Sequence, residues 1–301
     1  MCIQVRKVFE HLHISGHVHG MIMEDLHTYL EDSNDLLKYL ELCREGGKNL
    51  FLLTNSPWPF VDAGMRHVLR DQLSAADLDD WPALFDVVIV SARKPDWYTK
   101  RHLGFRRVDR QGKFLFEDVT ELQRGHVYSG GCMQEFVKLT GWSGSDVIYM
   151  GDHIYSDLSK PNKFASWKTA AIIKELEHEI TCQAQPRFEA DYTEAKNINL
   201  LIEHLQAEAP VEEINHLKAR RDAVRTRMKE HVNPHFGSVF RTHVGKSDFF
   251  QETLTYSDIY TSSVTNFLQY PLDWAFYPIR EPMAHDISPI VHTPVPPFPR
   301  A

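Results

Sequence analysis

The chain has 301 residues, 43% of them hydrophobic, and a formal net charge of -8. This acidic balance argues against a general nucleic-acid-binding protein, whose surface would be basic, and no apolar run approaches the roughly 20 residues that a membrane-spanning helix needs. The N-terminus has no signal-peptide pattern, and the four cysteines form no CxxC pair, which favours a reducing compartment. We therefore expect an intracellular protein, cytoplasmic or, if an N-terminal targeting segment is missing, mitochondrial.

The first distinctive segment is a histidine-rich run, HLHISGHVHG, which contains His11, His13, His17 and His19. At a period of two, each histidine pair would place its rings on one face of a strand, where they could bind a metal. No carboxylate or cysteine completes such a set, and Gly16 would break the register. We therefore expect a strand or loop here rather than a metal site.

Helical and strand patterns alternate from residue 33 to residue 90. Apolar residues at i, i+4 and i+7 from Leu36 share one helical face. Pro57 and Pro59 should keep the residues beside them out of regular structure. The expected elements are a helix from Ser33 or Asn34 to about Glu45, a strand over 49–53, a helix from Asp62 to about Leu73 and a strand over 85–90.

The same alternation continues after a charged excursion over residues 96–127, which carries a turn signal at 109–113. We expect a helix over about 132–139 and strands over 147–150 and 169–173. Strands that alternate with helices predict right-handed crossovers and a parallel sheet with helices on both faces, which is an α/β fold.

The last third of the chain has a different pattern. Residues 211–231 have helical spacing and many charges, which is typical of a long exposed helix or of a helix that binds a partner. Residues 236–276 are rich in aromatic side chains and should pack back on the core. Residues 289–301 are Pro-rich and should be disordered.

Polar residues follow three of the expected strands. Thr54 offers a hydroxyl beside backbone N–H groups, and Lys94 offers a cation that can neutralise phosphate. Gly151 permits a sharp turn after the third strand, and the carboxylates of Asp152 and Asp157 follow it. If these strands are adjacent and parallel, their ends meet at one edge of the sheet. A hydroxyl, a cation and carboxylates that suit Mg²⁺ together favour a phosphoryl-transfer site.

Several segments resemble the haloacid-dehalogenase superfamily and, more narrowly, the cytosolic purine 5′-nucleotidase and 5′-nucleotidase-domain-containing proteins. FLLTNS at 51–56, ARKP at 92–95 and YMGDHIYSD at 149–157 look like motifs two, three and four. VYSGG at 127–131, GSVFR at 237–241 and Tyr270-Pro271 are also similar. This resemblance spans roughly residues 3–287. It implies a Rossmann-like parallel sheet of the haloacid-dehalogenase type, with an incomplete core and a helical C-terminal extension.

The resemblance also implies Mg²⁺-dependent hydrolysis of nucleoside 5′-monophosphates or other phosphomonoesters. The implied roles are phosphate binding by Thr54 with Asn55 and Ser56, neutralisation of phosphate and nucleophile by Lys94, Mg²⁺ binding by Asp152, and positioning of Lys94 and metal-bound water by Asp157. The resemblance thus implies that Lys94 and Asp157 are catalytic residues.

One departure from the family pattern bears directly on activity. The family's first motif is a strand followed by Asp-x-Asp-x-Thr, and nothing in residues 1–50 matches it. We expect the nucleophile, the acid/base and one core strand to be missing. That strand would lie beside those that end at Thr54 and Asp152, so its absence would expose apolar edges and promote association. We therefore expect weak Mg²⁺ binding, no enzymatic turnover of monophosphates, and low solubility or a homo-oligomer.

Two function hypotheses remain: a 5′-nucleotidase-like phosphatase of which this chain holds half the site, and a non-catalytic pseudoenzyme or fragment that acts through its surface. The predicted organisation is a cap-to-core remnant over 1–30, a core over 31–205, a helical and aromatic-rich extension over 206–288 and the tail over 289–301.

Overall fold

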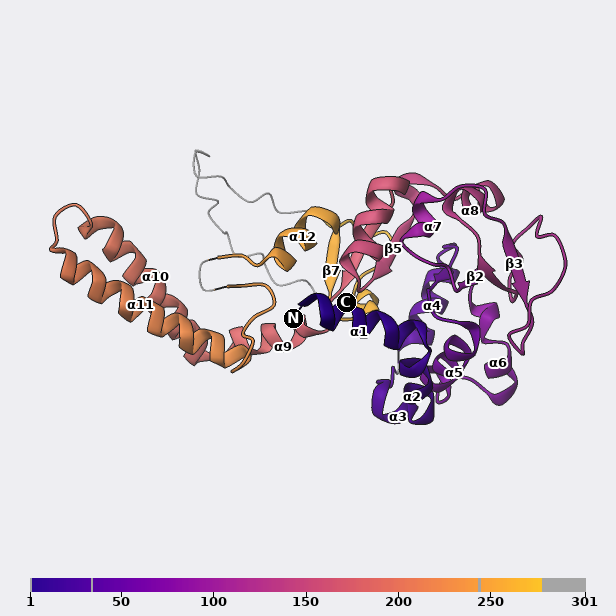
Figure 1. Ribbon diagram of the computed structural model, residues 1–301, viewed down its shortest axis with the longest axis horizontal. Coiled ribbons are helices and arrows are strands. Elements are labelled where there is room, and N and C mark those ends of the chain that lie inside the picture. The colour runs from indigo at the N-terminus through magenta and orange to yellow at the C-terminus, as the bar shows by residue number, and fades with distance from the viewer. Residues whose placement is uncertain (1, 34, 243–244, 278–301) are drawn as a thin grey trace.

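The computed structural model describes residues 2–33, 35–242 and 245–277 (Figure 1). Its first sheet has four strands in the order β1-β2-β4-β3: β1 (Phe51–Leu53), β2 (Val87–Val90), β4 (Val127–Gly130) and β3 (Phe105–Val108). β1, β2 and β4 are parallel, and β3 runs antiparallel to β4. The register places Leu52 opposite Val88 and Ile89 opposite Tyr128.

The second sheet contains three parallel strands, β5 (Ile148–Gly151), β6 (Lys168–Ile172) and β7 (Ile259–Thr261). The predicted α/β class with parallel strands is therefore confirmed. The strands form two sheets rather than one. The sequence patterns identified β1, β2, β5 and β6 but not β3, β4 or β7, each of which is only three or four residues long.

Helices make up much of the remaining described chain (Figure 1). The α-helices are α1 (Cys2–Ile14), α2 (His17–Glu24), α3 (Leu26–Tyr29), α4 (Leu36–Glu45), α5 (Trp58–Leu69), α6 (Ala75–Asp79), α7 (Asp96–Thr99), α8 (Met133–Thr140), α9 (Glu175–Gln183), α10 (Pro186–Leu205), α11 (Val211–Val232) and α12 (Asp248–Tyr256). Short 3-10 helices are η1 (Trp81–Leu84), η2 (Gly144–Asp146) and η5 (Val264–Gln269), and η3 (Ile154–Ser159) and η4 (Pro161–Ala165) are π-helical. No helix among the described residues is long and apolar enough to cross a membrane.

The first sheet is covered on both faces because β2 is buried throughout and its side chains alternate. Ile89 packs in a cluster with Trp97 of α7 and Phe136 of α8. Val88 packs in a second cluster with residues of α4 and α5, such as Leu40. Figure 1 accordingly shows α7 and α8 on one side of β2 and α5 on the other. A continuous apolar strand between two helical layers is what a buried parallel strand requires.

The two sheets meet at β1 and β5, each of which is a terminal strand of its sheet. Side chains make this contact: Phe51 stacks on Tyr149 at a centroid distance of 6.0 Å, and both pack around Trp167. One aromatic core therefore joins the sheets, although β1 and β5 share no strand pairing.

The structure corrects two expectations about local structure. The histidine-rich run is helical rather than a strand or loop, with His11 and His13 in α1 and His17 and His19 in α2, so the period-two pairing does not occur. The helix expected from Asp62 begins at Trp58, because Pro57 is its N-cap and Pro59 lies in the first turn, where proline loses no helical hydrogen bond.

Other expected boundaries agree more closely. α4 ends at Glu45 as expected, but its N-cap is Asp35, and Asn34 lies outside the described residues. The turn at 109–113 forms around Asp109, whose side chain accepts from the backbone N–H groups of Gln111 and Lys113.

The C-terminal part packs back on the second sheet as expected, since β7 pairs with β6 and Phe240 is buried beside α12 residues. The boundary predicted at 205–206 falls between α10 and α11, and the Pro-rich tail lies outside the described residues.

Candidate functional site

The loops that follow β1 and β2 are joined by hydrogen bonds. The Asn55 side chain accepts from the backbone N–H of Lys94 at 2.6 Å and donates to the Lys94 carbonyl at 2.9 Å. The backbone N–H of Ala92 donates to the Thr54 carbonyl, and that of Ser91 donates to the Ser56 carbonyl. The Asn55 side chain therefore fixes the position of the Lys94 backbone in the loop that follows β2.

Thr54 and Ser56 form a small turn at the end of β1. The Thr54 N–H continues the strand pairing by donating to the Ile89 carbonyl, while its hydroxyl accepts from the Ser56 N–H at 3.1 Å. Thr54 as a residue is half-buried, and its hydroxyl retains its own proton for a further acceptor.

The Lys94 ammonium group lies at the junction of the two sheets. It donates to Asp157 Oδ1 at 2.7 Å, to the Tyr149 hydroxyl at 2.8 Å and to the Leu53 carbonyl at 3.2 Å. The Lys94 and Asp157 side chains are only 9% and 7% exposed. Three acceptors match the three N–H donors of an ammonium group, so this buried cation is fully hydrogen-bonded.

Asp157 can reach Lys94 because of Gly151. A Cβ at position 151 would lie 2.5 Å from the Asp157 Cβ, so no larger residue fits without a shift. Asp157 lies in the π-helical η3, and its carboxylate also accepts from the Ser156 hydroxyl at 3.2 Å and from the His153 N–H at 3.4 Å. These two neutral donors are weaker partners than the Lys94 ammonium.

Tyr149 is a member of this site that sequence reasoning missed. Its hydroxyl donates to the Leu53 carbonyl at 3.0 Å while accepting from Lys94. Burial, with the nearby Tyr98 and Asp157, raises the pKa of Tyr149 well above its usual value, so the hydroxyl stays protonated at neutral pH. The available signal was a tyrosine inside an apolar strand, two residues before Gly151, because a buried tyrosine needs a hydrogen-bond partner.

Asp152 differs from Asp157 because its side chain is exposed. Its charge lies close enough to contribute, as the smallest of the named causes, to the raised pKa of Tyr149. An exposed carboxylate has the hard oxygen donors that Mg²⁺ prefers, and Mg²⁺ completes its shell with water and phosphate. Among the described residues, no three His, Cys, Asp or Glu side chains are grouped to hold a metal ion.

Together these strand ends offer a hydroxyl, a buried cation and an exposed carboxylate within one region. Such a set can neutralise a phosphate group and orient it. The roles predicted for Thr54, Asn55, Ser56, Lys94, Asp152 and Asp157 stay predictions. A groove of about 670 Å³ is found on α10 and α11 instead, away from these strand ends.

Comparisons with known proteins agree on one family. The 5′ nucleotidase family profile matches residues 1–288. The chain is 36% identical over 278 residues to human 5′-nucleotidase domain-containing protein 2, covering 91% of this chain and 52% of that protein. The rat protein of the same name is also 36% identical over 278 residues, covering 91% and 49%.

A 5′-nucleotidase domain-containing protein of Dictyostelium discoideum is 34% identical over 281 residues, covering 92% of this chain and 47% of that protein. The chain therefore spans about half the length of the curated relatives that it matches.

Proposed function

This chain belongs to the 5′ nucleotidase family, and from that premise we propose that the ends of β1, β2 and β5 form the phosphate-binding half of a phosphatase site. The reaction is Mg²⁺-dependent hydrolysis of nucleoside 5′-monophosphates, and the site is of the haloacid-dehalogenase type. The observation that carries this proposal is the buried Lys94 ammonium, held by Asp157 and Tyr149 beside the Thr54 turn.

Each residue has a distinct part in this proposal. The Thr54 hydroxyl donates to a phosphate oxygen, and the Lys94 charge stabilises the negative charge on the phosphoryl group. Asp157 and Asn55 hold Lys94 in place through its side chain and its backbone. Asp152 binds Mg²⁺, which supplies further neutralisation of the phosphate when bound.

Hydrolysis through a covalent intermediate also needs a carboxylate that attacks phosphorus and an acid that gives a proton to the leaving ester oxygen. Asp157 is poorly suited to attack, because it is buried and bonded to Lys94. We therefore assign the nucleophile and the acid to an Asp-x-Asp-x-Thr strand, a pattern that the 301 residues do not contain. β1 and β5 are terminal strands of their sheets, and each has an edge that no strand pairs among the described residues, where a further strand would pair.

The test is phosphate release from IMP and GMP with Mg²⁺ by two proteins. One is the chain as given, and the other is the chain joined upstream to an Asp-x-Asp-x-Thr strand. We expect turnover only in the joined protein, with Lys94→Met and Asp152→Ala each lowering kcat by at least about 100-fold. Robust turnover by the chain as given, abolished by Asp152→Ala, would overturn the assignment of the nucleophile. A folded but inactive joined protein would overturn the proposed reaction.

A non-catalytic interaction protein is the second candidate. The observation that favours it is the long helical hairpin of α10 and α11, which lies far from the strand ends (Figure 1).

A further inference from the structure

The helices α10 and α11 form a hairpin, residues 186–232, that we call the arm. Its helices pack against each other, and α9 is the main further element that either of them contacts. Figure 1 shows the arm projecting from the sheets, with its tip at the turn between the two helices. Twenty helical residues at about 1.5 Å each make the arm roughly 30 Å long.

The arm has a thin apolar core for its length. Its buried apolar residues are Ala195, Ile198, Ile214 and Val224, and three half-buried neighbours pack against this core. Large apolar side chains remain exposed near the tip: Leu200 is 46% exposed, and Val211 is 74% exposed. Two helices joined by so small a core gain little from tertiary packing, which is the main source of helix stability in proteins.

The charges of the arm are separated along its length. Residues 197–217, at the tip, contain four Glu and no Lys or Arg, a net charge of -4. The base, residues 186–196 and 218–232, contains eight Lys and Arg against five Asp and Glu, a net charge of +3. The arm as a whole carries about one negative charge, which does not fit the basic surface that nucleic acids require.

Some base charges are already paired within the arm. Arg220 pairs with Glu194 at 2.7 Å, and Arg227 pairs with Asp191 at 2.7 Å. Among the described residues, the tip glutamates Glu203, Glu208, Glu212 and Glu213 make no ion pair, and neither do the base lysines Lys196, Lys218 and Lys229. The unpaired charges are therefore negative at the tip and mostly positive at the base.

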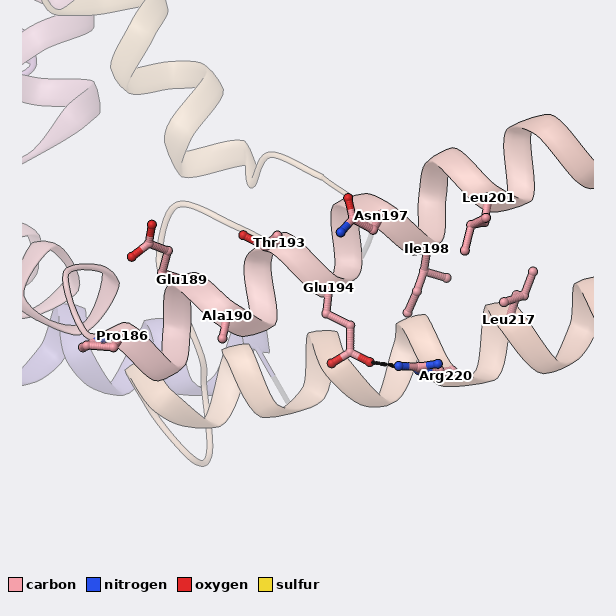
Figure 2. Close-up of a pocket in the computed structure, with 10 residues that line it drawn as sticks. All are labelled: Pro186, Glu189, Ala190, Thr193, Glu194, Asn197, Ile198, Leu201, Leu217 and Arg220. Carbon is pink, nitrogen blue, oxygen red and sulfur yellow. Dashed lines mark hydrogen bonds and ion pairs between the residues drawn. The ribbon is translucent and has the colours of Figure 1, made fainter. Parts of the chain in front are cut away.

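A groove of about 670 Å³ runs along one side of the arm. Figure 2 shows its lining: toward the tip it is apolar, with Ile198, Leu201 and Leu217, and the Glu194–Arg220 ion pair crosses it nearer the base. Leu201 is 48% exposed, so the tip end of the groove is an uncovered apolar surface.

We propose that the arm binds the arm of a second copy of this chain in an antiparallel pairing. The acidic tip of each copy lies on the basic base of the other, and the four helices form a bundle. Such a two-fold interface is self-complementary, because one chain supplies both charged ends. The pairing also covers Leu200 and Leu201 and gives the thin core the packing partners that it lacks.

The interface proposed here is small. A face roughly 30 Å long and 20 Å wide, about two helix diameters, buries about 600 Å² on each copy. The total of about 1,200 Å² is at the lower end for specific complexes, so we expect a dissociation constant in the micromolar range.

The test is sedimentation equilibrium of the full chain at concentrations from about 1 to 200 μM, the range around that expected affinity. A tip variant carries Glu208→Lys, Glu212→Lys and Glu213→Lys, and a base variant carries Lys196→Glu, Lys218→Glu and Lys229→Glu. We expect each to raise the dissociation constant at least about tenfold, and an equimolar mixture of the two to associate again. A control with Glu41→Lys, Asp118→Lys and Asp146→Lys changes the net charge as the tip variant does, but away from the arm.

Each outcome decides the proposal, provided that circular dichroism shows all variants to be folded. Weakening by tip and base variants, recovery in their mixture and an unchanged control support the arm pairing. A chain that stays monomeric throughout would overturn it. Association that both variants leave unchanged would also overturn it, and would point to the open edges of β1 and β5 instead.

Discussion

The buried ion pair between Lys94 and Asp157 can be tested by removing its charges one at a time. In Lys94→Met, the Asp157 carboxylate loses its charged donor and keeps only the Ser156 hydroxyl at 3.2 Å and the His153 N–H at 3.4 Å. An uncompensated charge at a side chain only 7% exposed is strongly destabilising, so we expect a loss of about 3–5 kcal/mol in the free energy of unfolding.

The opposite change should have a smaller effect. In Asp157→Asn, the Lys94 ammonium keeps the Tyr149 hydroxyl and the Leu53 carbonyl as acceptors. We expect a loss of about 1–3 kcal/mol, the range for a buried group with one partner removed. The double variant should be destabilised by at least about 1 kcal/mol less than the sum of the single losses, because the two side chains are in direct contact.

Urea unfolding at pH 7, followed by tryptophan fluorescence, measures all three losses, since Trp97 and Trp167 lie in the same core cluster as Tyr149. The matched control is the exposed pair Lys100–Asp96, also at 2.7 Å, with side chains 59% and 55% exposed. Removing either of its charges should change stability by less than about 1 kcal/mol. A loss below about 1 kcal/mol in Lys94→Met would refute the reasoning from burial.

Three further predictions follow from the same structure. Tyr149→Phe should lower the free energy of unfolding at pH 7 by about 1–2 kcal/mol in urea titrations. Above pH 10 the folded state keeps the Tyr149 proton and the unfolded state loses it. The stability of the wild type should therefore fall more steeply with rising pH than that of the variant. Gly151→Ala should lower the unfolding midpoint by creating a clash with Asp157 worth about 1–3 kcal/mol, whereas Gly104→Ala, whose Cβ would meet nothing within 4 Å, should leave it unchanged. Hydrogen bonding from Arg227 lowers the pKa of Asp191 below 3.8, so the stability difference between wild type and Asp191→Asn should be present at pH 7 and disappear as the pH falls below that value.

Each of these predictions can fail clearly. Equal slopes above pH 10 for wild type and Tyr149→Phe would mean that the tyrosine ionises in the folded state. A harmless Gly151→Ala would mean that η3 shifts freely. A constant difference for Asp191→Asn down to pH 2 would mean that its carboxylate charge plays no part in the arm.

Local sequence patterns were enough to predict most of the main helices and strands and the kinds of side chain at the candidate site. The apolar run at 85–90 predicted a parallel strand covered on both faces, because such a strand must be apolar at every position, and β2 is buried throughout. The polar residues that follow this run and the strand expected over 49–53 identified Thr54 and Lys94 as candidates. Two prolines misled the expectation for α5, since proline disrupts a helix interior but not its first turn.

Only the tertiary structure decided which partners these residues meet. The Tyr149 hydroxyl and the Leu53 carbonyl are 96 positions apart, and their contact joins two sheets where the sequence predicted one. The arm likewise combines a predicted and an unpredicted feature. Helical periodicity predicted α11, but the separation of charge between tip and base appears only because α10 packs antiparallel beside it. Periodicity reports which side of an element is buried, whereas strand pairing and long-range hydrogen bonds depend on how the whole chain packs.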